Sequence, residues 1–154
     1  MITILEVDIG GARYGVRLER VLEVAARVWL TPLPDAPPHV VGVFSYRGDL
    51  AVALDLRARL GQPPSPPRTT DHFVVVGGHG RAIALVVDRA IGARAIDPAA
   101  LRASPVSGTS LVRTIAVTEE GLVLLEDPDA LVSAEDLSVL DAAIARHAPA
   151  VELR

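Results

Sequence analysis

Apolar and other residues alternate along several short segments of the chain, and this two-residue period is typical of β-strands with one buried face. In residues 14–18, Tyr14, Val16 and Leu18 fall on one face, and residues 50–56 repeat the pattern with leucine and valine. Further short apolar runs, rich in β-branched residues and too short for ordinary helices, are residues 40–44, 73–76, 83–87 and 122–125. The pattern therefore predicts a chain built mainly from strands.

Glycine-containing turns separate successive strand candidates, which is the usual sign of a β-hairpin. The turns lie at residues 10–11, 47–49, 77–80 and 119–121. Two proline-rich stretches, residues 31–38 and 62–67, cannot lie inside a sheet because proline lacks the backbone N–H donor. We interpret them as extended connectors, the second of which divides four predicted hairpins two and two.

Helical signals are few and lie mainly towards the C-terminal end. Asp97 and Asp127 each precede a proline, a pair typical of an N-cap followed by the first helical residue, so each predicts a short helical turn. Residues 133–136 resemble a capping box and open a predicted helix over 134–147, whose apolar face carries Leu137, Leu140 and Ile144. Antiparallel hairpins with one terminal helix predict small β-barrels.

Composition narrows the classes of function. All 15 basic residues are arginine and cysteine is absent, which excludes Schiff-base lysine chemistry, thiolate nucleophiles, disulfides and zinc ribbons. The net charge of -4 argues against a nucleic-acid binder, which normally needs a basic surface. No apolar segment approaches the ~18–20 residues that span a bilayer. We therefore expect a soluble, cytoplasmic protein without direct membrane insertion.

No group of residues predicts catalysis. The glycines at 77–80 lie between two strands and not before a helix, so they predict a hairpin turn and not a phosphate loop. The scattered histidines lack metal-ligand spacing, and we expect neither a metal nor a cofactor. Asp55 and Asp88 each end an apolar strand, where a structural carboxylate is commoner than an acid–base pair. The arginines considered for pairing with them are Arg47, Arg57 and Arg89.

The order of these segments resembles that of the CheW-like family, the coupling proteins of bacterial chemotaxis arrays. Residues 14–24 are similar to the family's opening strand and its V-x-E-V turn. Residues 33–48 resemble the stretch that ends in asparagine-leucine-arginine-glycine, although Ser45 and Tyr46 replace its first two residues. Residues 54–61 and 85–90 resemble the family's aspartate-leucine and valine-aspartate segments, so the resemblance covers most of the chain.

The resemblance implies an all-β fold with minor α content. Its architecture is two SH3-like five-stranded β-barrel subdomains packed on a shared apolar core, with short helical turns and a C-terminal helix. We place the first barrel at residues 12–61 and the second at residues 70–126. The N-terminal strand and the helix at 134–147 are expected to pack across both barrels.

The resemblance also implies protein partners and no enzymatic activity. One barrel surface would bind the regulatory domain of a CheA-type histidine kinase, and a groove between the barrels would take the helical tip of a chemoreceptor. By position in the family's motifs, the partner-binding residues are Val21, Glu23, Val24, Val41, Arg47 and Gly48. Asp55, Arg57 and Asp88 are expected to form a structural motif.

Other roles stay open at this point. A CheW-like scaffold could serve another two-component pathway, such as pilus motility. A small barrel could also bind single-stranded nucleic acid on Trp29, Tyr46 and Arg47, although the acidic balance and the scarcity of aromatic residues disfavour this. A hydrolase built on dispersed carboxylates and histidines has no positive signal. The main expectation is a receptor–kinase adaptor in the cytoplasm, at membrane-associated receptor arrays.

Overall fold

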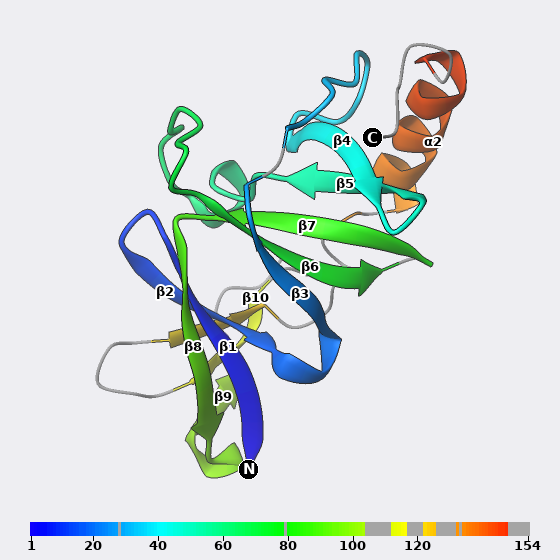
Figure 1. Cartoon of the computed structure of the whole chain (residues 1–154). Helices are drawn as coiled ribbons and strands as arrows, with labels where there is room; N and C mark the ends of the chain where they lie inside the picture. Colours follow the sequence, from blue (N-terminus) through cyan, green and yellow to red (C-terminus); the bar gives the residue numbers. More distant parts are fainter. Residues whose placement is uncertain are drawn as a thin grey trace.

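Two β-sheets and a C-terminal helix make up the described part of the molecule (Figure 1). The computed structural model describes residues 1–27, 29–78, 80–103, 112–116, 122–125, 132 and 134–147. One sheet has six strands in the order β8-β1-β2-β11-β10-β9, and the other has five in the order β3-β6-β7-β5-β4. This mainly β arrangement in two sheets confirms the predicted fold class.

The elements have the following bounds. The six-stranded sheet contains β1 (Ile2–Ile9), β2 (Ala12–Arg17), β8 (Arg89–Ile96), β9 (Leu101–Ala103), β10 (Val112–Ala116) and β11 (Leu122–Leu125). The five-stranded sheet contains β3 (Val21–Ala26), β4 (Val40–Tyr46), β5 (Asp49–Leu54), β6 (His72–Gly78) and β7 (Arg81–Val87). Short 3₁₀ turns lie at Leu18–Arg20, Ala58–Leu60 and Pro98–Ala100, and the helix α2 spans Ala134–His147.

The predicted hairpins are confirmed by antiparallel pairing of β1 with β2, β4 with β5, β6 with β7 and β10 with β11. At the β1–β2 turn, Gly10 and Gly11 have φ of 62° and 83°, the left-handed region that a tight hairpin turn requires. Asp97 also caps a helical turn as expected, because its Oδ1 accepts a hydrogen bond from the Ala99 N–H at 2.9 Å. Asp127 and Ser133 lie outside the described residues.

The strands are divided between the sheets differently from the ranges expected for the two barrels. β2 lies within residues 12–61 but belongs to the six-stranded sheet, where it pairs in parallel with β11. β6 and β7 lie within residues 70–126 but belong to the five-stranded sheet, where β7 pairs in parallel with β5. β1 is an inner strand between β8 and β2. Each sheet therefore combines segments from both halves of the chain, because pairings between distant strands join them.

β6 and β7 are buried on both faces, which explains their unbroken apolar sequences. Residues of one face, including Phe73 and Val86, form a cluster within the five-stranded sheet. Residues of the other face, including Val74 and Leu85, belong to a larger cluster shared with β1 and β2. The shared apolar core thus lies against one face of the five-stranded sheet.

The five-stranded sheet closes through the chain that follows β3. Thr31 exchanges two backbone hydrogen bonds with Val43 of β4, with N···O distances of 2.8 and 2.9 Å. β3 and β4 are the outermost strands in the order of this sheet, so the bridge brings its two edges together. A Cβ at Gly42 would lie 2.9 Å from the Thr31 carbonyl oxygen, so glycine permits the close crossing.

The helix α2 docks on the shared core through one apolar face. Leu140 is fully buried in the larger cluster, and Leu137 and Ile144 pack against it, as the predicted helical face requires. An ion pair joins Arg81 of β7 to Asp141 at 2.8 Å, and His39 Nε2 lies 3.5 Å from Asp136 Oδ2. Among the described residues, no helix combines the length and the apolar character that a membrane span needs.

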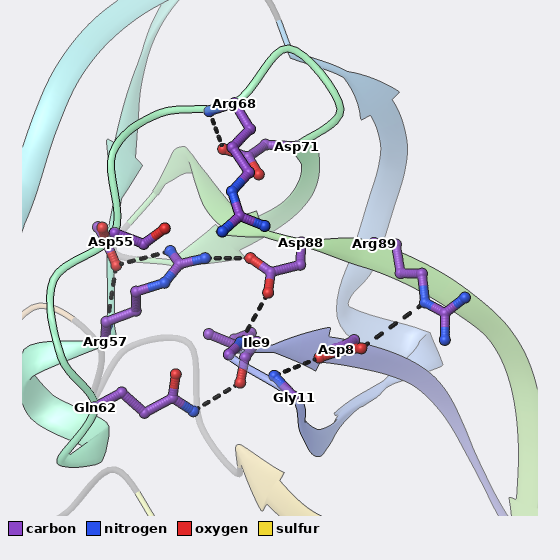
Figure 2. A network of polar contacts seen from close by, with 12 residues as sticks. Asp8, Ile9, Gly11, Asp55, Arg57, Gln62, Arg68, Asp71, Asp88 and Arg89 are labelled. Atoms are coloured by element: carbon purple, nitrogen blue, oxygen red, sulfur yellow. Dashed lines mark hydrogen bonds and ion pairs between the residues drawn. The ribbon is translucent and has the colours of Figure 1, made fainter.

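A polar network joins the two sheets (Figure 2). The guanidinium of Arg57, which follows β5, donates to the carboxylates of Asp55 and Asp88. Asp88 lies between β7 and β8, and its second oxygen accepts the Gly10 N–H from the β1–β2 turn at 2.9 Å. On the other side of this turn, Gln62 Nε2 donates to the Ile9 carbonyl at 2.6 Å. The network therefore links the end of the five-stranded sheet to a hairpin of the six-stranded sheet.

We expect Arg57→Met to lower the free energy of unfolding by about 2–3 kcal/mol, because it leaves two partly buried carboxylates without their shared cation. The matched control is Arg89→Met, since Arg89 is 60% exposed and lies 3.8 Å from Asp8. Its effect should stay within about 0.5 kcal/mol. Urea denaturation measures both changes, and equal destabilisation by the two variants would contradict a special role for Arg57.

We also expect His39 to make the protein less stable in acid. Burial lowers the pKa of His39 from its ordinary value of 6.5, an effect that Asp136 opposes and Arg59 reinforces. Because the unfolded chain then binds the proton more readily, the free energy of unfolding falls as the pH decreases from 6.5 through the lowered folded pKa. Above pH 6.5 the imidazole is neutral in both the folded and the unfolded state, so this loss of stability is absent.

Urea denaturation over a series of pH values tests the expectation for His39. In His39→Gln the decline of stability below pH 6.5 should be shallower than in the unmodified protein, since the buried imidazole is gone. Asp136→Asn should make the decline steeper, because it removes the carboxylate that favours the imidazolium. An unchanged slope in His39→Gln would refute the assignment.

Candidate partner-binding site

The residues expected to bind partners all lie in the five-stranded sheet or its turns. Val21, Glu23 and Val24 are on β3, Val41 is near the start of β4, and Arg47 and Gly48 form the β4–β5 turn. Val24 and Val41 are 41% and 37% exposed, which is unusual for valine. Val21 is different, because it is partly buried and packs against the shared core.

Leu22 is an exposed residue of β3 that sequence reasoning does not single out. The pairing of β3 with β6 shifts register between Val21 and Glu23, so Leu22 is an extra residue at a β-bulge. It is 53% exposed, which adds to the apolar surface of β3. Simple alternation along the sequence would not reveal it, because the bulge interrupts the two-residue period.

A groove of about 950 Å³ lies beside the β4–β5 turn, and we call it the turn groove. Its apolar lining includes Leu22, Tyr46, Leu50 and Ile144. Its basic lining residues are Arg20, Arg47 and Arg81, and its acidic ones are Asp49 and Asp141. The turn groove combines β3, two hairpin turns and α2, so it is held by elements that the core fixes in place.

Arg47 is positioned at this groove by the backbone and by an aromatic ring. Arg47 and Gly48 have φ of 52° and 84°, so the turn adopts the left-handed conformation of a tight hairpin. The guanidinium carbon of Arg47 lies 5.1 Å from the centre of the Tyr46 ring, a cation–π distance. The arrangement holds the arginine over the turn.

Glu23 lies close to Tyr46 and Arg47. Burial raises the pKa of the Tyr46 hydroxyl above its ordinary value of 10.0, the neighbouring Glu23 carboxylate raises it further, and Arg47 opposes the shift. The structure thus brings together Glu23 and Arg47, which lie far apart in the sequence, with Tyr46 between them. Tyr46 stays neutral at physiological pH.

Val41 lines a different depression, which we call the Trp29 pocket. It has a volume of about 460 Å³ and is lined by β4, β7 and the segments that follow β3 and β5. Trp29 lines it and is 88% exposed, and Asp55 and Arg57 line it as well. The expected partner-binding residues are therefore distributed over β3 and two hollows, and do not form a single patch.

The three residues expected to form a structural motif lie together. Arg57 is 7% exposed in its side chain and donates to both Asp55 and Asp88. Asp55 Oδ1 also accepts the Arg57 backbone N–H at 3.0 Å. Of the three arginines considered as partners, Arg57 is the one that forms ion pairs with both carboxylates. Within the described residues, no three histidine, aspartate or glutamate side chains gather where they could hold a metal ion.

Comparison with known proteins finds a family and relatives that match most of the chain. The model of the CheW-like domain family matches residues 3–136. Protein FrzA of Myxococcus xanthus is 38% identical over 102 residues, which cover 65% of this chain and 62% of FrzA. The chemotaxis protein CheW of Rhizobium meliloti is 24% identical over 132 residues, which cover 83% of this chain and 85% of that protein.

A solved structure has the same fold. The scaffolding protein TtCheW from Thermoanaerobacter tengcongensis superposes with a TM-score of 0.79 at 22% sequence identity, over 88% of this chain and 94% of that one. At this identity the likeness concerns the fold alone. The family match, by contrast, extends from β1 into α2. It includes the whole lining of the Trp29 pocket, the network around Arg57 and the turn groove except for Asp141 and Ile144. The chain therefore belongs to the CheW-like domain family.

Proposed function

We propose that this protein is a non-enzymatic adaptor that couples chemoreceptors to a CheA-type histidine kinase in bacterial chemotaxis. The carrying observation is its membership of the CheW-like domain family over residues 3–136. The name of one relative points the same way, since it is a chemotaxis protein CheW. The adaptor would act in the cytoplasm at membrane-associated receptor arrays.

The exposed apolar side chains of β3 and β4 support protein partners. Leu22, Val24 and Val41 are valine or leucine side chains open to solvent on a barrel whose interior is otherwise well filled. Exposed apolar residues mark a surface that another protein covers when they lie together, and Leu22 and Val24 are two residues apart on β3. Glu23, Arg47 and Gly48 add a polar cluster beside them, which would orient the partner.

The mechanism of such an adaptor is positional. By holding a kinase regulatory domain and the helical tip of a receptor at the same time, it turns their encounter into a local event at an effective concentration of order mM. A movement of the receptor would then shift the kinase between states with different contacts to the adaptor. The described residues supply surfaces for this task and no catalytic group is required.

A scaffold role in another two-component pathway, such as pilus motility, is the second candidate. One observation favours it: the relative with 38% identity carries the name Protein FrzA, which does not mention chemotaxis. The matched segment covers only 62% of FrzA, however, so the partners of that protein are not transferred to this chain. Both candidates require the same exposed surfaces, and they differ in which kinase and receptor are bound.

We expect Val24→Arg and Val41→Asp each to weaken partner binding by about tenfold or more, because each places a charge in an apolar contact. The matched control is Val139→Arg on α2, since Val139 is 45% exposed and lines neither hollow. The tagged proteins are used to capture partners from native cells, and the bound proteins are identified by mass spectrometry.

The adaptor hypothesis requires a histidine kinase and a helical receptor among the proteins captured by the unmodified chain and by the control. Loss of either partner in the Val24 or Val41 variant, with thermal stability unchanged, would support the surface. Recovery of a kinase from a pilus pathway would favour the second candidate. Capture of neither partner class by the unmodified chain would leave the resemblance as one of fold alone.

A further inference from the structure

Residues 62–68, which connect the 3₁₀ turn at Ala58–Leu60 to β6, carry prolines that the apolar core does not use. The segment reads Gln-Pro-Pro-Ser-Pro-Pro-Arg and belongs to no strand, helix or turn. All four of its prolines and Arg68 are exposed. Residues 63–67 form no backbone–backbone hydrogen bond with any residue that the structure describes. The segment is therefore an apolar, unpaired stretch of backbone on the surface.

The sequence of this segment restricts its backbone to the polyproline II helix, an extended helix with three residues per turn and no internal hydrogen bonds. The proline ring fixes φ near -65°, and the residue before a proline is driven to extended ψ. Each of residues 62–67 is a proline or precedes one. These two restrictions together give the φ and ψ of polyproline II.

Burial along the segment repeats every three residues, as this helix requires. Gln62 and Ser65 are partly buried, whereas the proline pairs at 63–64 and 66–67 are exposed. A helix with three residues per turn gives this pattern when one of its three rows of side chains rests on the protein. The other two rows consist of proline, and they face solvent side by side.

Both ends of the segment are anchored to the fold. Gln62 Nε2 donates to the Ile9 carbonyl at 2.6 Å and lies 3.2 Å from the Tyr14 hydroxyl. At the other end, the Arg68 N–H donates to Asp71 Oδ2 at 2.9 Å (Figure 2). The extended conformation is thus held before any partner arrives, which lowers the entropy cost of binding it.

The other proline-rich stretch, residues 31–38, lacks these features. Leu33 and Pro37 are buried, so its apolar side chains are partly used by the fold. Asp35 has φ of 66°, which interrupts an extended backbone. Proline content alone therefore does not single out residues 62–68, and the exposure of two proline rows does.

We propose that residues 62–68 are a docking ligand for a protein partner whose groove is lined by aromatic side chains. Grooves of this kind bind polyproline II segments because the segment is already ordered and presents its rings at a fixed spacing. The guanidinium of exposed Arg68 forms no ion pair among the described residues (Figure 2). An acidic side chain at the end of the groove would pair with it. This partner is additional to those of the proposed adaptor.

A photocrosslinker tests the proposal in native cells. In the full chain, Thr69→benzoylphenylalanine places the reactive group at an exposed position beside the segment, and crosslinked proteins are identified by mass spectrometry. We expect a crosslinked protein whose yield falls by about fivefold or more when Pro64→Ala and Pro67→Ala are added together, because one row of rings is lost. The matched control is Pro34→Ala with Pro38→Ala, two exposed prolines of the other stretch, which should leave the yield unchanged.

The purified partner then shows what its groove recognises. Free decaproline should displace the unmodified full chain from it, and a glycine–serine peptide of equal length should not, because only decaproline forms the polyproline II helix. Arg68→Ala should weaken binding by about threefold and reduce its dependence on salt.

Three results would each overturn the proposal: no crosslinked protein, equal yields from the two double variants, or no displacement by decaproline. The decaproline titration uses the unmodified chain, so it stays decisive if a variant is less stable. None of these results depends on whether the crosslinked protein is a kinase or a receptor. The outcome is therefore separate from that of the capture experiment with the Val24 and Val41 variants.

Discussion

The guanidinium of Arg57 is the group on which the relation between the two sheets depends. An arginine side chain cannot shed its charge in a protein, so its burial requires carboxylates on more than one side. Asp55 follows β5 and Asp88 follows β7, and because these strands pair in parallel, their C-terminal ends lie on the same side of the sheet. Asp88 also holds the Gly10 N–H of the β1–β2 turn. A single cation thus fixes two strand ends against a hairpin of the other sheet.

Close packing around the β1–β2 turn, where the network of Arg57 meets the six-stranded sheet, also restricts the backbone. A Cβ at Gly10 would lie 1.8 Å from the Gln62 side-chain oxygen, and Gly10 already needs φ of 62°. Gln62 donates to the Ile9 carbonyl from the proline-rich connector. The connector is therefore not a free linker, since it helps to seat the hairpin. The same connector supplies Pro67 to the Trp29 pocket, which ties the shape of that pocket to the junction.

Local features of the fold could be predicted from the sequence, and distant pairings could not. Glycine turns predict hairpins because a two-residue turn needs positive φ, and Gly10 and Gly48 supply it. The parallel pairings of β5 with β7 and β2 with β11 depend on packing between remote strands, and no local pattern encodes them. The expected barrel ranges followed sequence order for this reason. The α2 face was predictable because its period of apolar residues is local.

The site shows the same division between local and remote information. The motif positions predict Val24, Val41 and Arg47 as partner-binding residues, and the structure places them in solvent or at hollows. The motif positions do not predict the contact of Arg47 with Tyr46 or the nearness of Glu23. Leu22 is exposed through a bulge that only the pairing with β6 creates. Asp55 and Asp88 have several possible arginine partners in the sequence, and only the fold selects Arg57.

The two hollows lie at opposite ends of one strand, and this geometry suits a protein that holds two others. β4 contributes Val41 to the Trp29 pocket, and Tyr46, with Arg47 of the following turn, to the turn groove. At roughly 3.3 Å per residue, six residues of strand separate Val41 from Arg47 by about 20 Å. Side chains bound at one hollow would therefore not touch those at the other. Because the strand between them is bonded to β5 and packed against the core, the spacing of the two hollows is set by the barrel.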